Sequence, residues 1–242
     1  MSDTYATPQS DLVETSSDSE GSLERGLAGD YEINLSNILS EAWQKTKGVK
    51  RYILGAGIIM YVVMFAAIMV LGGIFGVGSD PNESSLVLQL SIQLIFIAIL
   101  LPFLAGIFII SARKIQGKPF EFGDAFGGFG KTGPLIVTGI IMNIMITIGT
   151  LLLIIPGIYL TVAYMFAIPL IIDRNLSPWE ALETSRKAIT KHWFSVFLFW
   201  LLMLVITIVC TIPFGLGLIW GLPMLSLAFA IIYREVFGIS SI

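Results

Sequence analysis

Four long stretches of this chain contain no charged side chain, and their lengths predict how it folds. The two longest are residues 135–172 and 194–233, with 38 and 40 residues. A helix of 38 residues would be roughly 57 Å long, nearly twice the roughly 30 Å of bilayer hydrocarbon. Each stretch must therefore fold back on itself. Pro156 and Gly157 predict the hairpin turn of the first stretch, and Pro213 interrupts the second.

Two shorter uncharged stretches, residues 52–79 and 84–112, predict one further hairpin. With 55% hydrophobic and 13% charged residues, the chain has too few polar side chains to coat a soluble domain of this size. We therefore predict an all-α, multi-pass membrane protein with six transmembrane helices in three hairpins. The expected spans are residues 52–78, 85–111, 135–155, 157–173, 194–212 and 215–234.

An amphipathic stretch precedes each predicted hairpin. Each stretch contains an acid, an alanine and a large apolar residue in succession: Glu41-Ala42-Trp43, Asp124-Ala125-Phe126 and Glu180-Ala181-Leu182. Large apolar residues beside Lys and Arg at the membrane edge are typical of a helix lying in the interface, so we expect one cytoplasmic-side amphipathic helix before each hairpin. The similarity reflects either a threefold internal repeat or three similar solutions to one boundary problem.

Residues 1–32 differ in composition from the rest of the chain. They hold eight acidic residues and one basic residue, Arg25, so their net charge is −7. A segment with so few apolar residues cannot offset its ordering entropy, and we predict a disordered acidic tail before a transmembrane domain of residues 33–242. The tail is either a docking arm for a protein partner or an inert leader.

The distribution of basic residues predicts the orientation. All fourteen lie before the first span, between the second and third, between the fourth and fifth, or at the end of the sixth. Cytoplasmic loops carry the excess of Lys and Arg in membrane proteins. Both termini are therefore expected in the cytoplasm.

The predicted spans carry few polar groups. No Asp, Glu, His or Arg lies within the uncharged stretches, although ion-coupled transporters usually place such residues inside the membrane. Gln89, Gln93 and Asn143 are the main polar residues there. They either line a route for a solute or lipid or form hydrogen bonds between helices.

Candidate chemistry outside the spans is also sparse. Asp173, Arg174, Glu180, Ser185 and Arg186 are expected to gather where the fourth span meets the third amphipathic helix. Such a cluster either binds a lipid headgroup or joins two helices through ion pairs. The single histidine lacks metal-ligand partners at suitable spacing, and no nucleophile stands beside a base. We expect no catalytic residues, no cofactor, no metal ion and no nucleic-acid partner, and hence no enzyme.

One part of the chain resembles a known family. The resemblance rests on residues 153–160, with the sequence LIIPGIYL, then on Tyr164, Phe166, Ala167, residues 169–173, residues 177–182, Ser185 and Arg186. This pattern is similar to the membrane domain attached to some bacterial glycerophosphoryl diester phosphodiesterases, and to related bacterial inner-membrane families. The resemblance implies an all-helical domain in the bacterial inner membrane. Since the sequence ends shortly after the sixth span, we expect the membrane domain without the catalytic domain.

Two functions of different class agree with these observations. The first is a non-catalytic membrane protein that organises membrane lipids or partner proteins, either as a single chain or as a homo-oligomer. The alternative is a permease or channel for a lipid or an uncharged small solute.

Overall fold

The described part of the chain is helical throughout. The computed structural model describes residues 21–75 and 86–242, and no strand occurs among them. Six of its helical segments are long and apolar enough to cross a membrane, which confirms the prediction of an all-α, multi-pass membrane protein. The elements are α1 (Leu23–Ala28), α2 (Leu35–Lys45), α3 (Lys50–Phe75), α4 (Leu86–Ile115), the 3₁₀-helix η1 (Phe122–Lys131), α5 (Thr132–Leu152), α6 (Ile154–Ala163), α7 (Ala167–Arg174), α8 (Pro178–Lys191), α9 (Trp193–Thr211) and α10 (Leu218–Phe237).

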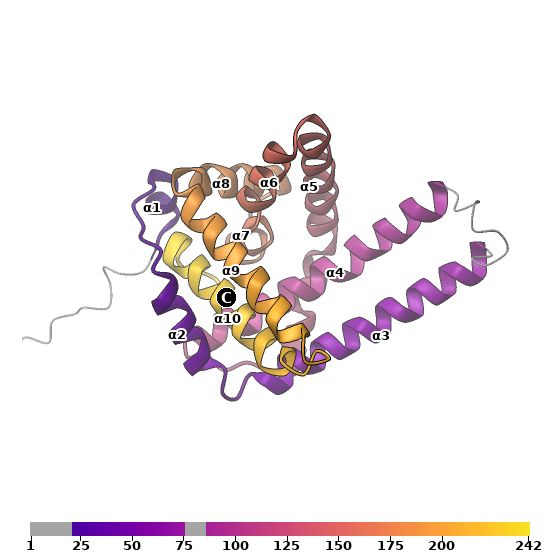
Figure 1. Cartoon of the computed structure of the whole chain (residues 1–242), viewed down its shortest axis with the longest axis horizontal. Coiled ribbons are helices and arrows are strands. Elements are labelled where there is room, and N and C mark those ends of the chain that lie inside the picture. The colour runs from indigo at the N-terminus through magenta and orange to yellow at the C-terminus, as the bar shows by residue number, and fades with distance from the viewer. Residues whose placement is uncertain (1–20, 76–85) are drawn as a thin grey trace, which may run out of the picture.

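Helix α10 lies at the centre of the molecule. It packs against α2, α4 and α9, whereas the end of α3 and the start of α4 project together beyond the other helices (Figure 1). More than half of α10 is buried by protein, 56% of its apolar window, but only 11% of α9. The apolar residues of α10 therefore form a protein core, and those of α9 are mostly left for lipid.

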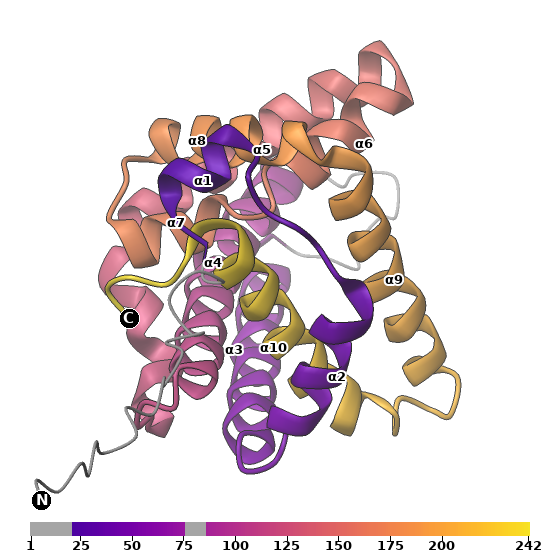
Figure 2. The same ribbon diagram turned by 90° about the vertical axis from the view of Figure 1, so that its left-hand side faces the viewer.

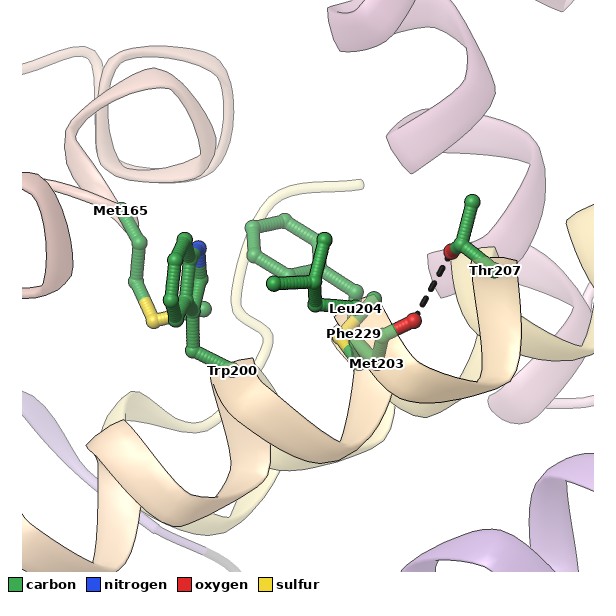
Figure 3. A pocket seen from close by; sticks show the side chains of 6 residues that line it. All are labelled: Met165, Trp200, Met203, Leu204, Thr207 and Phe229. Carbon is green, nitrogen blue, oxygen red and sulfur yellow. Dashed lines mark hydrogen bonds between the residues drawn. The ribbon is translucent and has the colours of Figure 1, made fainter. Parts of the chain in front are cut away.

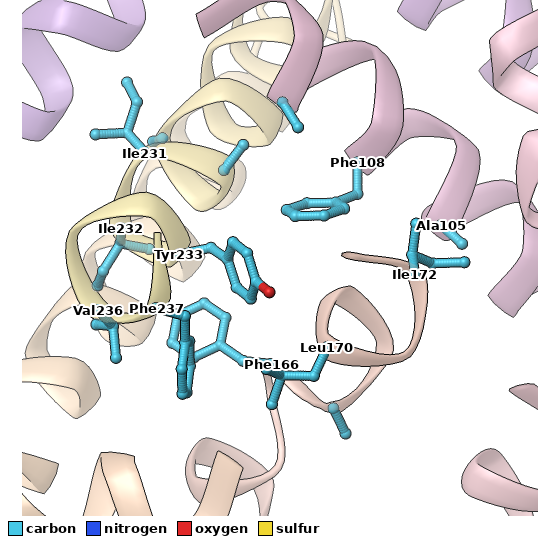
Figure 4. Packing of buried hydrophobic residues seen from close by; sticks show 14 of the residues in the cluster. Ala105, Phe108, Phe166, Leu170, Ile172, Ile231, Ile232, Tyr233, Val236 and Phe237 are labelled. Atoms are coloured by element: carbon cyan, nitrogen blue, oxygen red, sulfur yellow. The ribbon is translucent and has the colours of Figure 1, made fainter. Parts of the chain in front are cut away.

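Aromatic side chains fill the core around α10. Tyr233, Phe166 and Phe237 are fully buried, and Phe108 of α4 nearly so (Figure 4). The rings of Phe108 and Tyr233 meet edge to face with centroids 5.1 Å apart, and those of Phe166 and Phe237 at 5.9 Å. Such pairs contribute about 0.5–1.5 kcal/mol each beyond their buried area. They join α4, α10 and the residue that precedes α7 into one unit.

The fourth predicted span, residues 157–173, is broken into two helices. Helix α6 ends at Ala163 and α7 begins at Ala167. Pro169 has no amide hydrogen to donate to the carbonyl of Met165, and its ring would clash with that carbonyl in a continuous helix. The proline therefore lies in the first turn of a new helix, where it is tolerated.

The turn between α5 and α6 lies slightly earlier than Pro156 and Gly157, where the sequence predicted it. The chain reverses at Leu153, whose backbone is extended, and Pro156 is the third residue of α6. Gly157 is buried against α5, because a Cβ there would lie 2.1 Å from Thr150 Oγ1. Pro156 thus lies in the first turn of α6, and Gly157 allows α5 and α6 to touch.

A helix precedes each of the three hairpins, as the amphipathic stretches predicted. These helices are α2, η1 and α8, the second being a 3₁₀-helix that runs back along α4. The alanines of the three acid-alanine-apolar tripeptides, Ala42, Ala125 and Ala181, are each completely buried. A Cβ on Gly106 would lie 1.9 Å from the carbonyl oxygen of Ala125, so only glycine allows η1 to approach α4 this closely. Whether the tripeptides mark a true repeat stays a prediction.

Residues 21–32, assigned to the disordered tail, are folded in the structure, and this corrects the predicted boundary. Ser22 caps α1, Gly26 is buried, and the hydroxyl of Tyr31 donates to the carbonyl oxygen of Ala188 at 2.9 Å. Figure 2 shows α1 lying across the end of the molecule beside α8. The acidic composition of this segment did not indicate its short capped helix or its buried tyrosine. The remainder of the predicted tail, residues 1–20, lies outside the described residues.

The start of α3 lies beside the start of α10. The ammonium of Lys50 is 5.1 Å from the ring centroid of Trp220. Strict alternation of six spans would place these two residues at opposite membrane surfaces. The hairpins therefore do not stand side by side as a simple up-and-down bundle, and the orientation of the termini stays a prediction.

Candidate functional site

The predicted cluster at the α7–α8 junction separates into independent contacts. Asp173 is completely buried at the end of α7 and accepts hydrogen bonds from the Tyr233 hydroxyl and the Ser240 and Ser241 amides, each at 2.9 Å. Arg174 Nε lies 3.1 Å from the same carboxylate, but its N–H is not directed at it, so the contact is an ion pair without a hydrogen bond. The hydrogen bonds from Ser240 and Ser241 fasten the segment after α10 to α7.

Arg174 also holds the end of α10. Its guanidinium donates to the carbonyl oxygen of Phe237 at 2.6 Å. Lys131 approaches from η1 and donates to the carbonyl oxygens of Ile171 and Ile172, at 2.8 and 3.2 Å. These cations occupy backbone acceptors within the fold, which supports the junction interpretation of Asp173 and Arg174.

The remaining members of the predicted cluster have separate partners on α8. Glu180 accepts from the amide and hydroxyl of Ser177, which forms a capping box and lowers the pKa of Glu180. Arg186 forms two hydrogen bonds with Glu183, at 2.8 and 2.9 Å, and they lower the pKa of Glu183. Neither residue contacts Asp173.

Ser185 stabilises the break between α6 and α7. Its side chain is completely buried, donates to the carbonyl oxygen of Ala163 at 2.7 Å and accepts from the amide of Phe166 at 3.3 Å. A broken helix inside a membrane protein is tolerated where side chains satisfy the freed backbone groups. Ser185 therefore stabilises the break between α6 and α7. Ser185 and Asp173 do not share a site, so their positions do not support a common headgroup-binding cluster.

The residues of the predicted polar seam lie on α4 and α5. Gln89, Gln93 and Asn143 are all exposed, and no hydrogen bond joins Gln93 to Asn143 in the described structure. The contact between α4 and α5 is made instead by Gly139, where a Cβ would lie 2.5 Å from a methyl carbon of Leu101. Close packing of small and apolar groups holds these helices together.

An apolar hollow lies beside the broken helix. Its volume is about 320 Å³, and α9 forms most of its wall (Figure 3). The single hydroxyl in the wall, on Thr207, donates to the carbonyl oxygen of Met203 at 2.8 Å, so it adds no free polar group. The residues that line the hollow are Met165, Trp200, Met203, Leu204, Thr207 and Phe229.

The position of the hollow follows from the break at residues 164–166. Met165 belongs to neither helix, and its side chain lies near Trp200 in Figure 3. The hollow is at mid-length of α9 and α10, both long enough to cross a membrane. A groove at that depth accepts an apolar group, and its volume is at the lower end of the roughly 300–1,000 Å³ typical of small-molecule pockets.

Sequence reasoning missed this hollow. Trp200, Met203 and Thr207 follow one another at helical spacing, but residues of this kind are equally common on buried and lipid-facing surfaces. The available signal was Pro169, since it predicts the break that sets Met165 opposite α9.

The comparisons with known proteins give no relative. No protein-family model matches the chain, and no curated protein or solved structure matches it significantly. Within residues 21–75 and 86–242, no three His, Cys, Asp or Glu side chains gather in a way that would hold a metal ion. The similarity to the phosphodiesterase membrane domain therefore stays a prediction.

Proposed function

We propose that this integral membrane protein is non-catalytic and organises membrane lipids by holding an acyl chain against α9. The observation that carries the proposal is the hollow of about 320 Å³ at mid-length of α9. Its wall is made of thioether, aromatic and aliphatic groups, and its one hydroxyl is engaged with the backbone. An acyl chain is the apolar group that surrounds such a site in a bilayer.

The surroundings of α9 support this proposal. Leu204, Val205 and Ile208 are 42%, 47% and 55% exposed, so lipid reaches the helix directly. A chain that leaves the bulk bilayer for the hollow keeps an apolar environment and gains packing contacts with Trp200 and Phe229.

The wider setting of this role is also proposed. The protein acts in the bacterial inner membrane, and its acidic residues 1–20 recruit a protein partner. A deletion for testing that recruitment removes residues 1–20 only, because α1 and Tyr31 belong to the folded domain. The alternative, a permease or channel, has less support, because Gln93 and Asn143 are exposed rather than gathered in a polar route.

Native mass spectrometry of the protein extracted in polymer discs tests the acyl-chain site. Leu204→Trp fills the hollow, whereas Val205→Trp adds the same ring to the next position, which does not line it. We expect the wild type and Val205→Trp to retain one lipid per chain after mild activation, and Leu204→Trp to lose it. Equal lipid retention by both variants would contradict the proposal.

A further inference from the structure

A second hollow, of about 460 Å³, lies at the junction of α2 and α3. It is lined by Gly48, Lys50 and Arg51. Lys114 approaches from α4, because a Cβ placed on Gly48 would lie 4.0 Å from its ammonium nitrogen. Gly48 has a φ of +85°, which a residue with a side chain rarely adopts, and this tight turn keeps the hollow open between the three cations.

The cations around this hollow have no carboxylate partner among the described residues. Lys47, Lys50, Arg51 and Lys114 form no ion pair there. Neighbouring cations differ, since each is paired with an acid: Lys45 and Arg234 with Glu41, and Arg113 with Asp124. The acids of this region are therefore engaged elsewhere, and the positive charge of the hollow is uncompensated.

Aromatic rings hold two of these cations in place without neutralising them. Lys50 Nζ lies 5.1 Å from the ring centroid of Trp220, and the guanidinium carbon of Arg51 lies 4.7 Å from that of Tyr52. Arg51 also donates to the Tyr52 hydroxyl at 2.7 Å. A cation on a ring keeps its full charge and most of its N–H donors for a further ligand.

The start of α3 adds to the positive electrostatic potential of the hollow. The helix begins at Lys50 and has 26 residues, and the amides of Lys50 and Arg51 donate to no backbone carbonyl in the described structure. Such amides and the helix dipole favour an anion at a helix start. Because α3 is long and apolar enough to cross a membrane, a spanning α3 would place its start near the depth of lipid phosphates.

We infer that this hollow binds a phosphate group of an anionic ligand, with Lys50, Arg51 and Lys114 as the cations that hold it. The ligand source is either the headgroup of an anionic lipid or free phosphate, and the chemistry of the contact is the same for both. The headgroup source rests on the proposed lipid-organising function, whereas the phosphate site itself does not. Guanidinium and ammonium donors at a helix start match the tetrahedral oxygens of phosphate.

A binding titration on the full chain in detergent tests the site. The probes are dihexanoyl phosphatidic acid, dihexanoyl phosphatidylcholine and inorganic phosphate, read by isothermal titration calorimetry. Lys50→Gln with Arg51→Gln removes two cations from the hollow. Lys187→Gln with Lys191→Gln removes the same charge from α8, which does not line it. We expect phosphatidic acid to saturate the wild type, with affinity reduced about tenfold or more in the first pair and within about twofold in the second.

The probes distinguish the source of the ligand. Saturation by phosphatidic acid that inorganic phosphate does not displace supports a lipid headgroup, and displacement by inorganic phosphate supports free phosphate. Absence of saturation with both anions would overturn the site, as would equal weakening in the two double variants, which indicates general electrostatic attraction. If the first pair does not fold, Lys50→Gln alone replaces it. Failure here leaves lipid retention at Leu204 unaffected, so the two proposals fail separately.

Discussion

Replacing Asp173 by asparagine tests whether its buried carboxylate fastens the end of the chain to α7. The carboxylate accepts hydrogen bonds from Tyr233, Ser240 and Ser241 and pairs with Arg174. Asp173→Asn keeps the volume but removes the charge, and it turns an amide group toward groups that donate. Removal of one partner from a buried ion pair costs about 3–5 kcal/mol.

For Asp173→Asn we expect a cost at the lower end of the range of about 3–5 kcal/mol. The Arg174 side chain is 23% exposed and keeps its bond to the Phe237 carbonyl, so it is not left fully uncompensated. We expect Asp173→Asn to lower the free energy of unfolding by about 3 kcal/mol. Tyr233→Phe, which removes a single hydrogen bond to the carboxylate, should lower it by about 2 kcal/mol.

Equilibrium unfolding by denaturant in mixed micelles, followed by circular dichroism, measures these changes. Glu183→Gln is the control, because its ion pair with Arg186 lies near the surface and such pairs contribute about 0–1 kcal/mol. The double variant of Asp173 and Tyr233 should lose less than the sum of the single losses, since both share one contact. An Asp173→Asn protein as stable as the Glu183→Gln control would refute the reasoning.

Three further predictions concern the packing, the N-terminal segment and the topology. Gly157→Leu should disrupt the α5–α6 hairpin, because a Cβ at Gly157 would lie 2.1 Å from a threonine hydroxyl of α5. Gly133→Leu is the control, since a Cβ at Gly133 meets open space. Thermal unfolding of both variants in detergent measures the difference, and equal melting temperatures would contradict the prediction. Burial raises the pKa of Tyr31 to about 12 from 10.0, so the neutral phenol is favoured in the fold; stability should be complete below about pH 10 and fall by up to about 3 kcal/mol as the pH rises to 12. Tyr31→Phe should be less stable by about 1 kcal/mol at pH 8 and lack this alkaline loss, and unfolding curves at pH 8 and 11.5 that fall alike in both proteins would exclude Tyr31 as the cause. The start of α10 lies beside Lys50, so residues 47 and 214 are expected at the same membrane surface. In a cysteine-free background, cysteines introduced at Lys47 and Phe214 should therefore react alike with an impermeant thiol reagent on intact cells, and a cysteine at Asn82 should react differently. Equal labelling at Phe214 and Asn82 would contradict this and support a simple alternation of the six spans.

Much of the architecture was predictable from local sequence patterns. Uncharged stretches locate the membrane helices, because a charged group in hydrocarbon is too costly to be placed there without a partner. The helix start at Ser177 was equally predictable, since Ser177 and Glu180 satisfy each other's backbone groups within one turn. Such features depend on neighbouring residues and on the surrounding solvent alone.

The candidate sites depended on contacts between distant residues. Asp173 and Arg174 were predicted as members of a larger cluster with residues of α8, but their partners Tyr233 and Phe237 lie on another helix. The uncompensated charge near Lys50 becomes evident only once Glu41 is seen to pair with Arg234. A sequence reports which charges are present and not which of them neutralise one another.

By itself the sequence determined that this chain forms apolar helices in hairpins with an amphipathic helix before each, because hydrophobic runs and helix caps act over short distances. Only the tertiary structure decided that residues 21–32 belong to the folded domain, that α10 is a protein core, and that Lys50 lies beside Trp220. Apolar residues face lipid or protein equally well in a bilayer, since lipid tails are as apolar as leucine. The choice between those neighbours is made by shape, through close approaches such as Gly106 on Ala125, and shape is a property of the assembled fold.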